Sequence, residues 1–348
     1  RVLVTGAGGT IGSELVRQIA AFGPARLALA DASEFNLYSI DLEMAERHPD
    51  LPRAAILADV RDRVRVEAMV AAEAPQLVFH AAALKHVPMV ELNPVEGVLT
   101  NAIGTRHVAD ACRAAGVEAM VLISTDKAVN PANVMGATKR LAESYCQALD
   151  LVEHRRNGGT RFVTVRFGNV LGSTGSVVPL FQRQLAQGGP LTVTHPEMTR
   201  YFMTVREAVE LVLQATTIGL DRESAAGEIH VLDMGAPVRI VDLARQMIRL
   251  AGLRPDLDVA IAFTGLRPGE KLTEELFHDA EALVPTTHPA IRRAAPRTVD
   301  AAFLARGIDE IAETARAGRG EATRALLHRL VTDYRPPAAA PPTALSAR

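Results

Sequence analysis

A run of glycines lies near the start of the chain, between a short β-branched segment and an amphipathic one. Residues 2–5 have the pattern of a strand, and the apolar positions after residue 12 recur with the spacing of a helix. Gly6, Gly9 and Gly12 stand between them. Glycines at this spacing allow a tight turn, a close approach of the backbone to a pyrophosphate, and close packing of the helix on the sheet. The pattern therefore predicts a phosphate-binding turn, although a glycine triad alone would indicate only a turn.

The second predicted strand, residues 26–30, ends at Asp31. Its distance from the glycines, about twenty residues, is that of the carboxylate that binds both hydroxyls of an adenosine ribose. Such a carboxylate would repel a phosphate at the 2′ position, so we predict NAD rather than NADP as the cofactor. In the alternative, Asp31 only caps the helix that follows.

A cluster of polar side chains follows the apolar run at residues 121–123. Its members are Ser124, Thr125, Asp126 and Lys127. A second lysine, Lys139, lies on the next predicted helix. Ligands bind at the carboxyl ends of the strands in open parallel sheets, so this cluster predicts a reactive site. In the alternative, it is a solvated loop that turns at residues 130–131.

Strands and helices alternate along the first half of the chain, which predicts an α/β fold with a doubly wound parallel sheet. We expect residues 1–172 to form a nucleotide-binding domain. The pattern then loosens. Short strands are expected at 191–194, 228–232 and 258–263, and amphipathic helices near 205–218 and 239–251. We expect residues 173–334 to form mainly a smaller substrate lobe, and residues 335–348 a disordered tail of low complexity.

Several loops between these elements carry candidate ligand-binding groups. Asp59 and Val60, after the third strand, are placed to meet an adenine edge, and the small residues 81–83 would let a cofactor lie against the backbone. His80 has apolar neighbours and is expected in the core, whereas Lys85 is better placed to reach the site. Arg200 and residues 266–271 lie in polar loops, and arginine suits a diphosphate because its planar fork makes paired bonds. In the alternative, each of these cations is only a surface residue.

Composition excludes several classes of protein. The chain has 38 basic and 40 acidic residues, a net charge of −2, and no basic block of the kind that binds nucleic acid. Its two cysteines lack metal-site spacing, so neither a disulfide framework nor a zinc site is expected. No apolar run approaches the roughly eighteen residues of a membrane span. The absence of a disulfide framework fits the reducing cytosol, so we expect a cytoplasmic protein. The sequence begins within a strand and without methionine, so we also expect a fragment of a longer protein.

These motifs together resemble the extended short-chain dehydrogenase/reductase superfamily, and within it the nucleotide-sugar 4,6-dehydratases of capsule and glycan biosynthesis. The resemblance covers nearly the whole chain and rests on residues 5–12, 80–88, 124–127, 166–170 and 267–271. It implies a Rossmann fold with a smaller C-terminal substrate lobe, a UDP-N-acetylhexosamine substrate and NAD. The residues then expected at the cofactor are Gly6, Gly9, Thr10, Ile11, Gly12, Asp31, Ser33, Asp59, Val60, Ala81, Ala82, Ala83, Asn101, Ser124, Lys139 and Val170. Those expected at the substrate are Lys85, Thr125, Asn169, Ser176, Arg200, Arg267 and Glu270.

One position departs from the superfamily. Where its Tyr-x-x-x-Lys pair would stand, this chain has Met135 and Lys139, and a thioether cannot accept a proton. The family includes a Met-bearing branch of larger, membrane-anchored UDP-N-acetylglucosamine 4,6-dehydratases that retain the configuration at C5. The resemblance to that branch implies a homo-oligomer, and an inner-membrane anchor outside this sequence. In the alternative, Met135 fills the core of an inactive protein.

The resemblance implies a role for each residue of the reactive cluster. Asp126 would accept the proton of the C4 hydroxyl and later protonate the C6 oxygen, while Thr125 holds the C4 oxygen. Lys127 would take the C5 proton, which requires a lowered pKa. Lys139 would bind the nicotinamide ribose. Two further hypotheses remain open, a nucleotide-sugar C4 epimerase and a non-catalytic module that senses NAD or sugar nucleotides.

Overall fold

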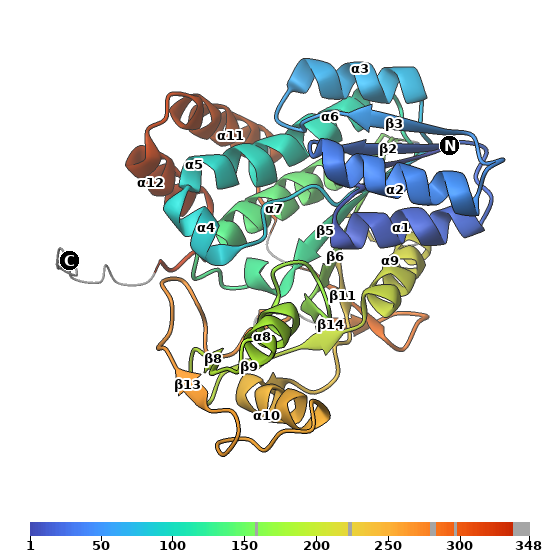
Figure 1. The fold of residues 1–348 in the computed structure, drawn as a ribbon. Helices are drawn as coiled ribbons and strands as arrows, with labels where there is room; N and C mark the ends of the chain where they lie inside the picture. The colour runs from blue at the N-terminus through green and yellow to red at the C-terminus, as the bar shows by residue number, and fades with distance from the viewer. Residues whose placement is uncertain (157–158, 222–224, 279–282, 296–297, 337–348) are drawn as a thin grey trace.

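The computed structural model describes the chain apart from residues 157–158, 222–224, 279–282, 296–297 and 337–348 (Figure 1). Its described residues form one nine-stranded sheet in the order β14-β15-β11-β6-β5-β4-β1-β2-β3. In this sheet order, β11, β6, β5, β4, β1, β2 and β3 are parallel to one another. Strand β15 is antiparallel to both of its neighbours, β11 and β14. The bounds of the nine strands are β1 Val2–Thr5, β2 Leu27–Asp31, β3 Arg53–Leu57, β4 Leu77–His80, β5 Ala119–Thr125, β6 Arg161–Phe167, β11 Ile229–Leu232, β14 Leu283–Pro285 and β15 Ile291–Ala294. The predicted doubly wound parallel sheet is confirmed.

Helices cover both faces of the sheet because its central strands are apolar on both sides. One face packs against α1 (Thr10–Ala21), α2 (Glu34–Arg47) and α9 (Val205–Leu220). The other face packs against α3 (Arg63–Glu73), α6 (Thr105–Ala114), α7 (Val134–His154) and α11 (Ala301–Arg316). Shorter helices, α4 (Val87–Leu92) and α5 (Pro94–Gly97), and the last helix, α12 (Gly320–Leu330), lie beside α7.

An irregular helical segment lies between α5 and α6. Residues Val98–Gly104 form a π-helix. The wider turn holds the buried Asn101, whose amide donates to the carbonyl of Leu84 and to Thr138 Oγ1. Asn101 thereby ties the loop after β4 to α7. π-Helical turns often occur at functional sites, and this one fixes a loop that was predicted to meet the cofactor.

The second half of the chain does not form a separate lobe throughout. Strand β11 pairs with β6, α9 packs on α1 and β6, and α11 packs on α7. A division at residue 172 therefore cuts through the sheet. The reason is that the second half of the chain contributes to the sheet itself. Its apolar strand β11 extends the sheet, and its amphipathic helices α9 and α11 cover the two faces.

The smaller lobe is built from α8 (Val177–Ala186), β8 (Leu191–Val193), α10 (Ile240–Leu250) and β13 (Ile261–Phe263). These elements share a separate apolar cluster, and Figure 1 shows them gathered on one side of the sheet. Three further pairs of short strands join within the second half; they are β7 (Asn169–Val170) with β10 (Phe202–Met203), β9 (Thr199–Arg200) with β12 (Val238–Arg239), and β8 with β13. The strands and helices expected in this region are confirmed to within a few residues.

Among the described residues, no helix combines the length and the apolar character that crossing a membrane requires. Residues 337–348 of the expected tail lie outside the described part of the chain.

Candidate active site

The glycine turn has the geometry of a phosphate cradle. Gly6 has a φ of 70°, and a Cβ atom there would lie 2.6 Å from the backbone nitrogen of Ala82. A Cβ atom on Gly12 would lie 1.9 Å from the carbonyl oxygen of Gly6, so only glycine lets α1 approach the turn. Helix α1 begins at Thr10 with no side-chain cap and no acidic residue in its first turn. Its first amides are therefore suited to an anionic ligand such as a pyrophosphate.

Asp31 is held beside this turn. Its Oδ2 accepts a hydrogen bond from the Gly8 amide at 2.9 Å, and its Oδ1 accepts one from the Ser33 amide at 2.8 Å. The N-cap of α2 is Ser33, whose hydroxyl accepts from the Asn36 amide, so Asp31 does not act as that cap. A carboxylate fixed at the end of β2 agrees with the predicted ribose contact.

The remaining predicted cofactor residues fall into two groups. Some line the same edge of the sheet: residues 81–83 follow β4, and Thr10 Oγ1 accepts a hydrogen bond from the Thr174 amide across the turn. Others contact neighbouring residues of the protein. Asp59 pairs with Arg61, Val170 is buried, Ile11 packs against the core, and the carbonyl of Val60 lies 3.0 Å from the ring nitrogen Nδ1 of His107. His80 is fully buried between Thr5 and Thr105, and burial lowers its pKa to about 3, so the expected core histidine is confirmed.

The polar cluster after β5 is buried rather than solvated. Asp126 is fully buried in the short 3₁₀ turn Asp126–Ala128. Its Oδ1 accepts from Thr125 Oγ1 at 2.8 Å and from Lys127 Nζ at 2.9 Å. Lys127 Nζ also donates to Asn169 Oδ1 at 3.1 Å. The alternative of a solvated loop is therefore wrong, because a charged pair is buried here at the carboxyl end of the sheet.

The structure corrects the expected charge state of Lys127. Burial lowers the pKa of its ammonium group, but the carboxylates of Asp126 and Glu274 outweigh burial and raise that pKa above its ordinary value. A lowered pKa is found instead at Lys139, where burial lowers it to about 8. Lys127 is thus an ammonium group in the ligand-free protein, and it needs another group to take its proton before it can act as a base.

Lys139 and Ser124 lie beside the buried pair of Glu143 and Arg166, which was not predicted to be part of the site. Lys139 Nζ donates to the carbonyl of Ile123 at 2.6 Å, and Ser124 Oγ donates to Glu143 Oε1 at 2.6 Å. Glu143 also accepts two hydrogen bonds from Arg166, at 2.8 and 2.7 Å. The hydroxyl of Ser124 therefore faces Glu143. One signal was available in the sequence, since Lys139 and Glu143 are four residues apart and share a helix face.

Met135 lies in the core. It is 3% exposed and packs in the apolar cluster between α7 and the sheet. The next residue, Gly136, fixes the site more directly. A Cβ atom on Gly136 would lie 2.1 Å from the carbonyl oxygen of Lys127, so glycine lets α7 begin against the turn that carries Asp126.

A hollow of about 190 Å³ opens beside Lys127. Its charged lining residues are Lys85, Lys127, Arg200, Arg267, Glu270 and Glu274. Arg267 is largely exposed and pairs with Glu270 at 3.0 Å. The guanidinium of Arg200 is buried and donates to the carbonyls of Thr199, Lys271 and Leu272. Arg200 therefore holds the 267–271 loop in place, and the exposed Arg267 is the better candidate for a diphosphate.

Two predicted substrate residues adjoin residues that line this hollow. Asn169 points its amide oxygen at Lys127, as described above. Ser176 precedes α8, and its buried hydroxyl has no hydrogen-bond partner among the described residues. The neighbouring Gly175 lies against His86, where a Cβ atom would be 2.5 Å from the imidazole Cε1.

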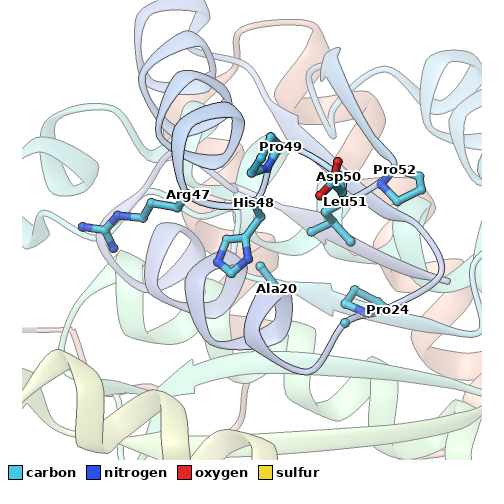
Figure 2. A pocket seen from close by; sticks show the side chains of 9 residues that line it. Ala20, Pro24, Arg47, His48, Pro49, Asp50, Leu51 and Pro52 are labelled. Atoms are coloured by element: carbon cyan, nitrogen blue, oxygen red, sulfur yellow. The ribbon is translucent and has the colours of Figure 1, made fainter.

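A larger hollow, of about 420 Å³, lies elsewhere (Figure 2). It is lined by the segments that follow α1 and α2 and lead into β2 and β3, namely Ala20, Gly23, Pro24, Arg47, His48, Pro49, Asp50, Leu51 and Pro52. These segments precede the strands, whereas the glycine turn and Asp126 follow strands. The larger hollow therefore lies at the amino ends of the parallel strands, whereas the candidate active site lies at their carboxyl ends.

Comparison with known proteins places the chain in a family. Residues 2–296 match the family described as polysaccharide biosynthesis protein. The chain belongs to this family. The chain is 50% identical over 281 residues to the capsular polysaccharide biosynthesis protein CapD of Staphylococcus aureus. The aligned region covers 80% of this chain and 45% of CapD. The chain thus spans about half the length of CapD.

Other relatives carry the names of two different activities. The chain is 34% identical over 275 residues to an inverting UDP-N-acetylglucosamine 4,6-dehydratase of Campylobacter jejuni, with 78% of this chain and 76% of that protein covered. It is also 34% identical over 287 residues to a UDP-glucose 4-epimerase of Rickettsia rickettsii, with 80% and 78% covered. The solved structure of Pen from Bacillus thuringiensis is 32% identical, covers 86% of this chain and 88% of its own, and superposes with a TM-score of 0.75.

Proposed function

We propose that this member of the polysaccharide biosynthesis family is a UDP-N-acetylglucosamine 4,6-dehydratase that uses NAD and retains the configuration at C5. Its product would be a UDP-2-acetamido-2,6-dideoxy-4-keto-hexose for polysaccharide or glycan assembly. The observation that carries the proposal is the Asp126–Lys127 pair at the end of β5, in which Asp126 is fully buried and Lys127 lines the hollow together with Lys85 and Arg267. A dehydratase needs an acid and a base at neighbouring carbons, and this pair supplies both.

The residues around the glycine turn fit NAD. The amides at the start of α1 would bind the pyrophosphate, and Asp31 would accept from the adenosine ribose hydroxyls. Lys139 would donate to the nicotinamide ribose. When bound, NAD accepts a hydride from C4 of the sugar and returns it to C6.

A substitution in the turn tests this assignment. We expect Gly12→Ala to weaken NAD binding at least about tenfold and to lower the free energy of unfolding by about 1–3 kcal/mol, because the new methyl group would overlap the Gly6 carbonyl. Calorimetric titration with NAD and thermal melting measure the two effects. Gly320→Ala is the control, since its Cβ atom would lie 3.8 Å from the nearest atom. An unchanged NAD affinity in Gly12→Ala would contradict the cradle.

Asp126 handles the protons of the two sugar oxygens. Its carboxylate accepts the proton of the C4 hydroxyl as that carbon becomes a carbonyl, and Thr125 positions the C4 oxygen. The same proton then passes from Asp126 to the departing C6 oxygen, which leaves as water. Asp126 thus ends the cycle in the state in which it began.

Lys127 handles the proton of C5. That proton is acidified by the neighbouring C4 carbonyl, and the neutral amine of Lys127 removes it before the C6 oxygen leaves. The same amine returns a proton to the same face of C5, which retains the configuration. The dehydratase of Campylobacter jejuni is named as inverting, whereas retention is proposed here because a single base works on one face of C5.

The epimerase is the second candidate, and the Rickettsia relative favours it. An epimerase exchanges hydride at C4 alone and has no use for a base at C5 or an acid at C6. The buried Asp126–Lys127 pair therefore supports the dehydratase. A non-catalytic sensing module is the third candidate, and it does not account for the intact set of Asp126, Lys127 and Lys139.

One incubation separates the three candidates. We expect the protein, given UDP-N-acetylglucosamine and NAD in deuterated water, to form a 6-deoxy-4-keto sugar in which deuterium enters at C5 with the configuration kept. Proton NMR of the sugar follows the reaction. Formation of a C4 epimer would support the epimerase instead, and an unchanged substrate would support the sensing module.

A further inference from the structure

A second buried carboxylate faces Lys127, and the steps above do not use it. Glu274 lines the same hollow and is 4% exposed. Its Oε1 lies 3.9 Å from Lys127 Nζ and 3.8 Å from Arg200 Nη2. Its Oε2 is buried and has no hydrogen-bond partner among the described residues. A buried carboxylate oxygen without a donor is costly, so this atom is suited to receive a proton.

Three cations and one other carboxylate act on Glu274. The cations are Lys127, Arg200 and Lys271, and the carboxylate is that of Asp126. Burial is the largest influence and raises the pKa of the Glu274 carboxyl, and Asp126 raises it further, against the three cations. Transfer of one proton from Lys127 to Glu274 would turn a buried ion pair into a neutral amine and a neutral acid. In a site of low dielectric constant, that exchange costs less than it would in water.

We propose that Glu274 takes the proton of the Lys127 ammonium group when substrate fills the hollow, and so produces the amine that removes the C5 proton. This inference rests on the proposed dehydratase function. One N–H bond of Lys127 breaks and one O–H bond of Glu274 forms. The amine then accepts the C5 proton and returns a proton to C5. Glu274 finally gives its proton back to Lys127, so no group is consumed.

The distance between the two groups fits a step that substrate completes. A separation of 3.9 Å is longer than a hydrogen bond, and catalytic contacts are often long in ligand-free proteins. The lysine stem is flexible enough to close it. Lys127 is held away from Glu274 by its bonds to Asp126 and Asn169. Protonation of Asp126 by the C4 hydroxyl removes the charge that attracts Lys127, which frees its ammonium group to approach Glu274.

The test compares wild-type protein with Glu274→Gln, which keeps the shape of the side chain but cannot accept the proton. We expect kcat of the variant at pH 7 to fall about 100-fold, with little change in KM. We also expect kcat of the variant to rise about tenfold per pH unit above pH 7, because its Lys127 must lose its proton to solvent, whereas wild-type kcat stays flat. Glu67→Gln is the control, since Glu67 is an exposed glutamate that pairs with Arg63 on α3, away from the hollow.

Two further measurements guard against a merely structural effect. In the ligand-free protein, NMR of ¹³C-labelled lysine should give Lys127 a lower pKa in Glu274→Gln than in wild type, because a neighbouring negative charge is gone. Glu274→Asp should keep a flat pH profile at a reduced rate. If Glu274→Gln fails to fold, a sloping profile in Glu274→Asp would overturn the relay.

The outcomes separate the relay from the proposed function. A wild-type protein that forms no 4-keto product refutes the dehydratase, and the relay with it. If wild type forms the product, then Glu274→Gln with wild-type kcat, or with a loss that is equal at every pH, refutes the relay alone. A loss that recovers as the pH rises supports it.

Discussion

Replacement of Asp126 by asparagine should lower kcat for sugar dehydration by about 10⁴-fold while NAD remains bound. The carboxylate is expected to act twice, as the base at the C4 oxygen and as the acid at the C6 oxygen, and general acid–base catalysis contributes up to about 10⁴. Asparagine has nearly the same shape and can still accept a hydrogen bond from Lys127, so the pocket should keep its geometry. Proton NMR of the sugar measures turnover, and calorimetry measures NAD affinity.

Asp309→Asn is the matched control, because Asp309 is an exposed carboxylate that pairs with Arg106 away from the hollow. It should leave turnover within a factor of about two, since exposed pairs contribute little. Dehydration at the wild-type rate by Asp126→Asn would refute the role given to Asp126. Loss of NAD affinity in that variant would show that Asp126 supports the cofactor site instead.

Replacement of Arg166 by methionine should lower the free energy of unfolding by about 3–5 kcal/mol. Arg166 is 1% exposed and holds the fully buried Glu143 with two hydrogen bonds, so the variant would leave the buried carboxylate with the more distant Arg140, at 3.6 Å, in place of its hydrogen-bonded cation. Denaturant-induced unfolding at neutral pH, extrapolated to water, measures the change in the free energy of unfolding. Glu143→Gln in the same background should recover part of the loss, because no unpaired charge is then buried.

The surface pair of Arg206 and Glu210 provides the comparison for this prediction. Both side chains are largely exposed, and Arg206→Met should change the free energy of unfolding by less than about 1 kcal/mol. Equal effects of Arg166→Met and Arg206→Met would mean that the buried pair does not hold the helix that carries Lys139 against β6.

The parts of the site that sequence reasoning found are those whose position follows from local pattern. The glycine turn is recognisable because a strand and a helix flank it within a few residues, and Asp126 because it ends an apolar strand. Glycine at positions 6 and 12 is required by contacts within the turn and with residues 81–82. Local spacing was enough to predict where these residues lie in the sheet.

The parts that it missed depend on contacts between distant segments. Glu274 is brought to Lys127 by a loop that Arg200 holds through backbone carbonyls, and no local period encodes that approach. The step at C5 requires a lowered pKa at Lys127, which burial or the positive charges of Lys139 and an oxidised nicotinamide nearby would produce. The two carboxylates that raise it come from its neighbour in sequence and from a residue 147 positions away in the chain. Similarly, β11 joins the sheet from beyond the expected boundary at residue 172.

A crystal structure with NAD and UDP-N-acetylglucosamine bound tests the central claim most directly. The account predicts that an Asp126 carboxylate oxygen lies within about 3.2 Å of the C4 oxygen, and that Lys127 Nζ lies over the C5 hydrogen, close enough to remove it. A complex in which the hexose lies beyond reach of both side chains, with its C5 and C6 facing solvent, would contradict the account.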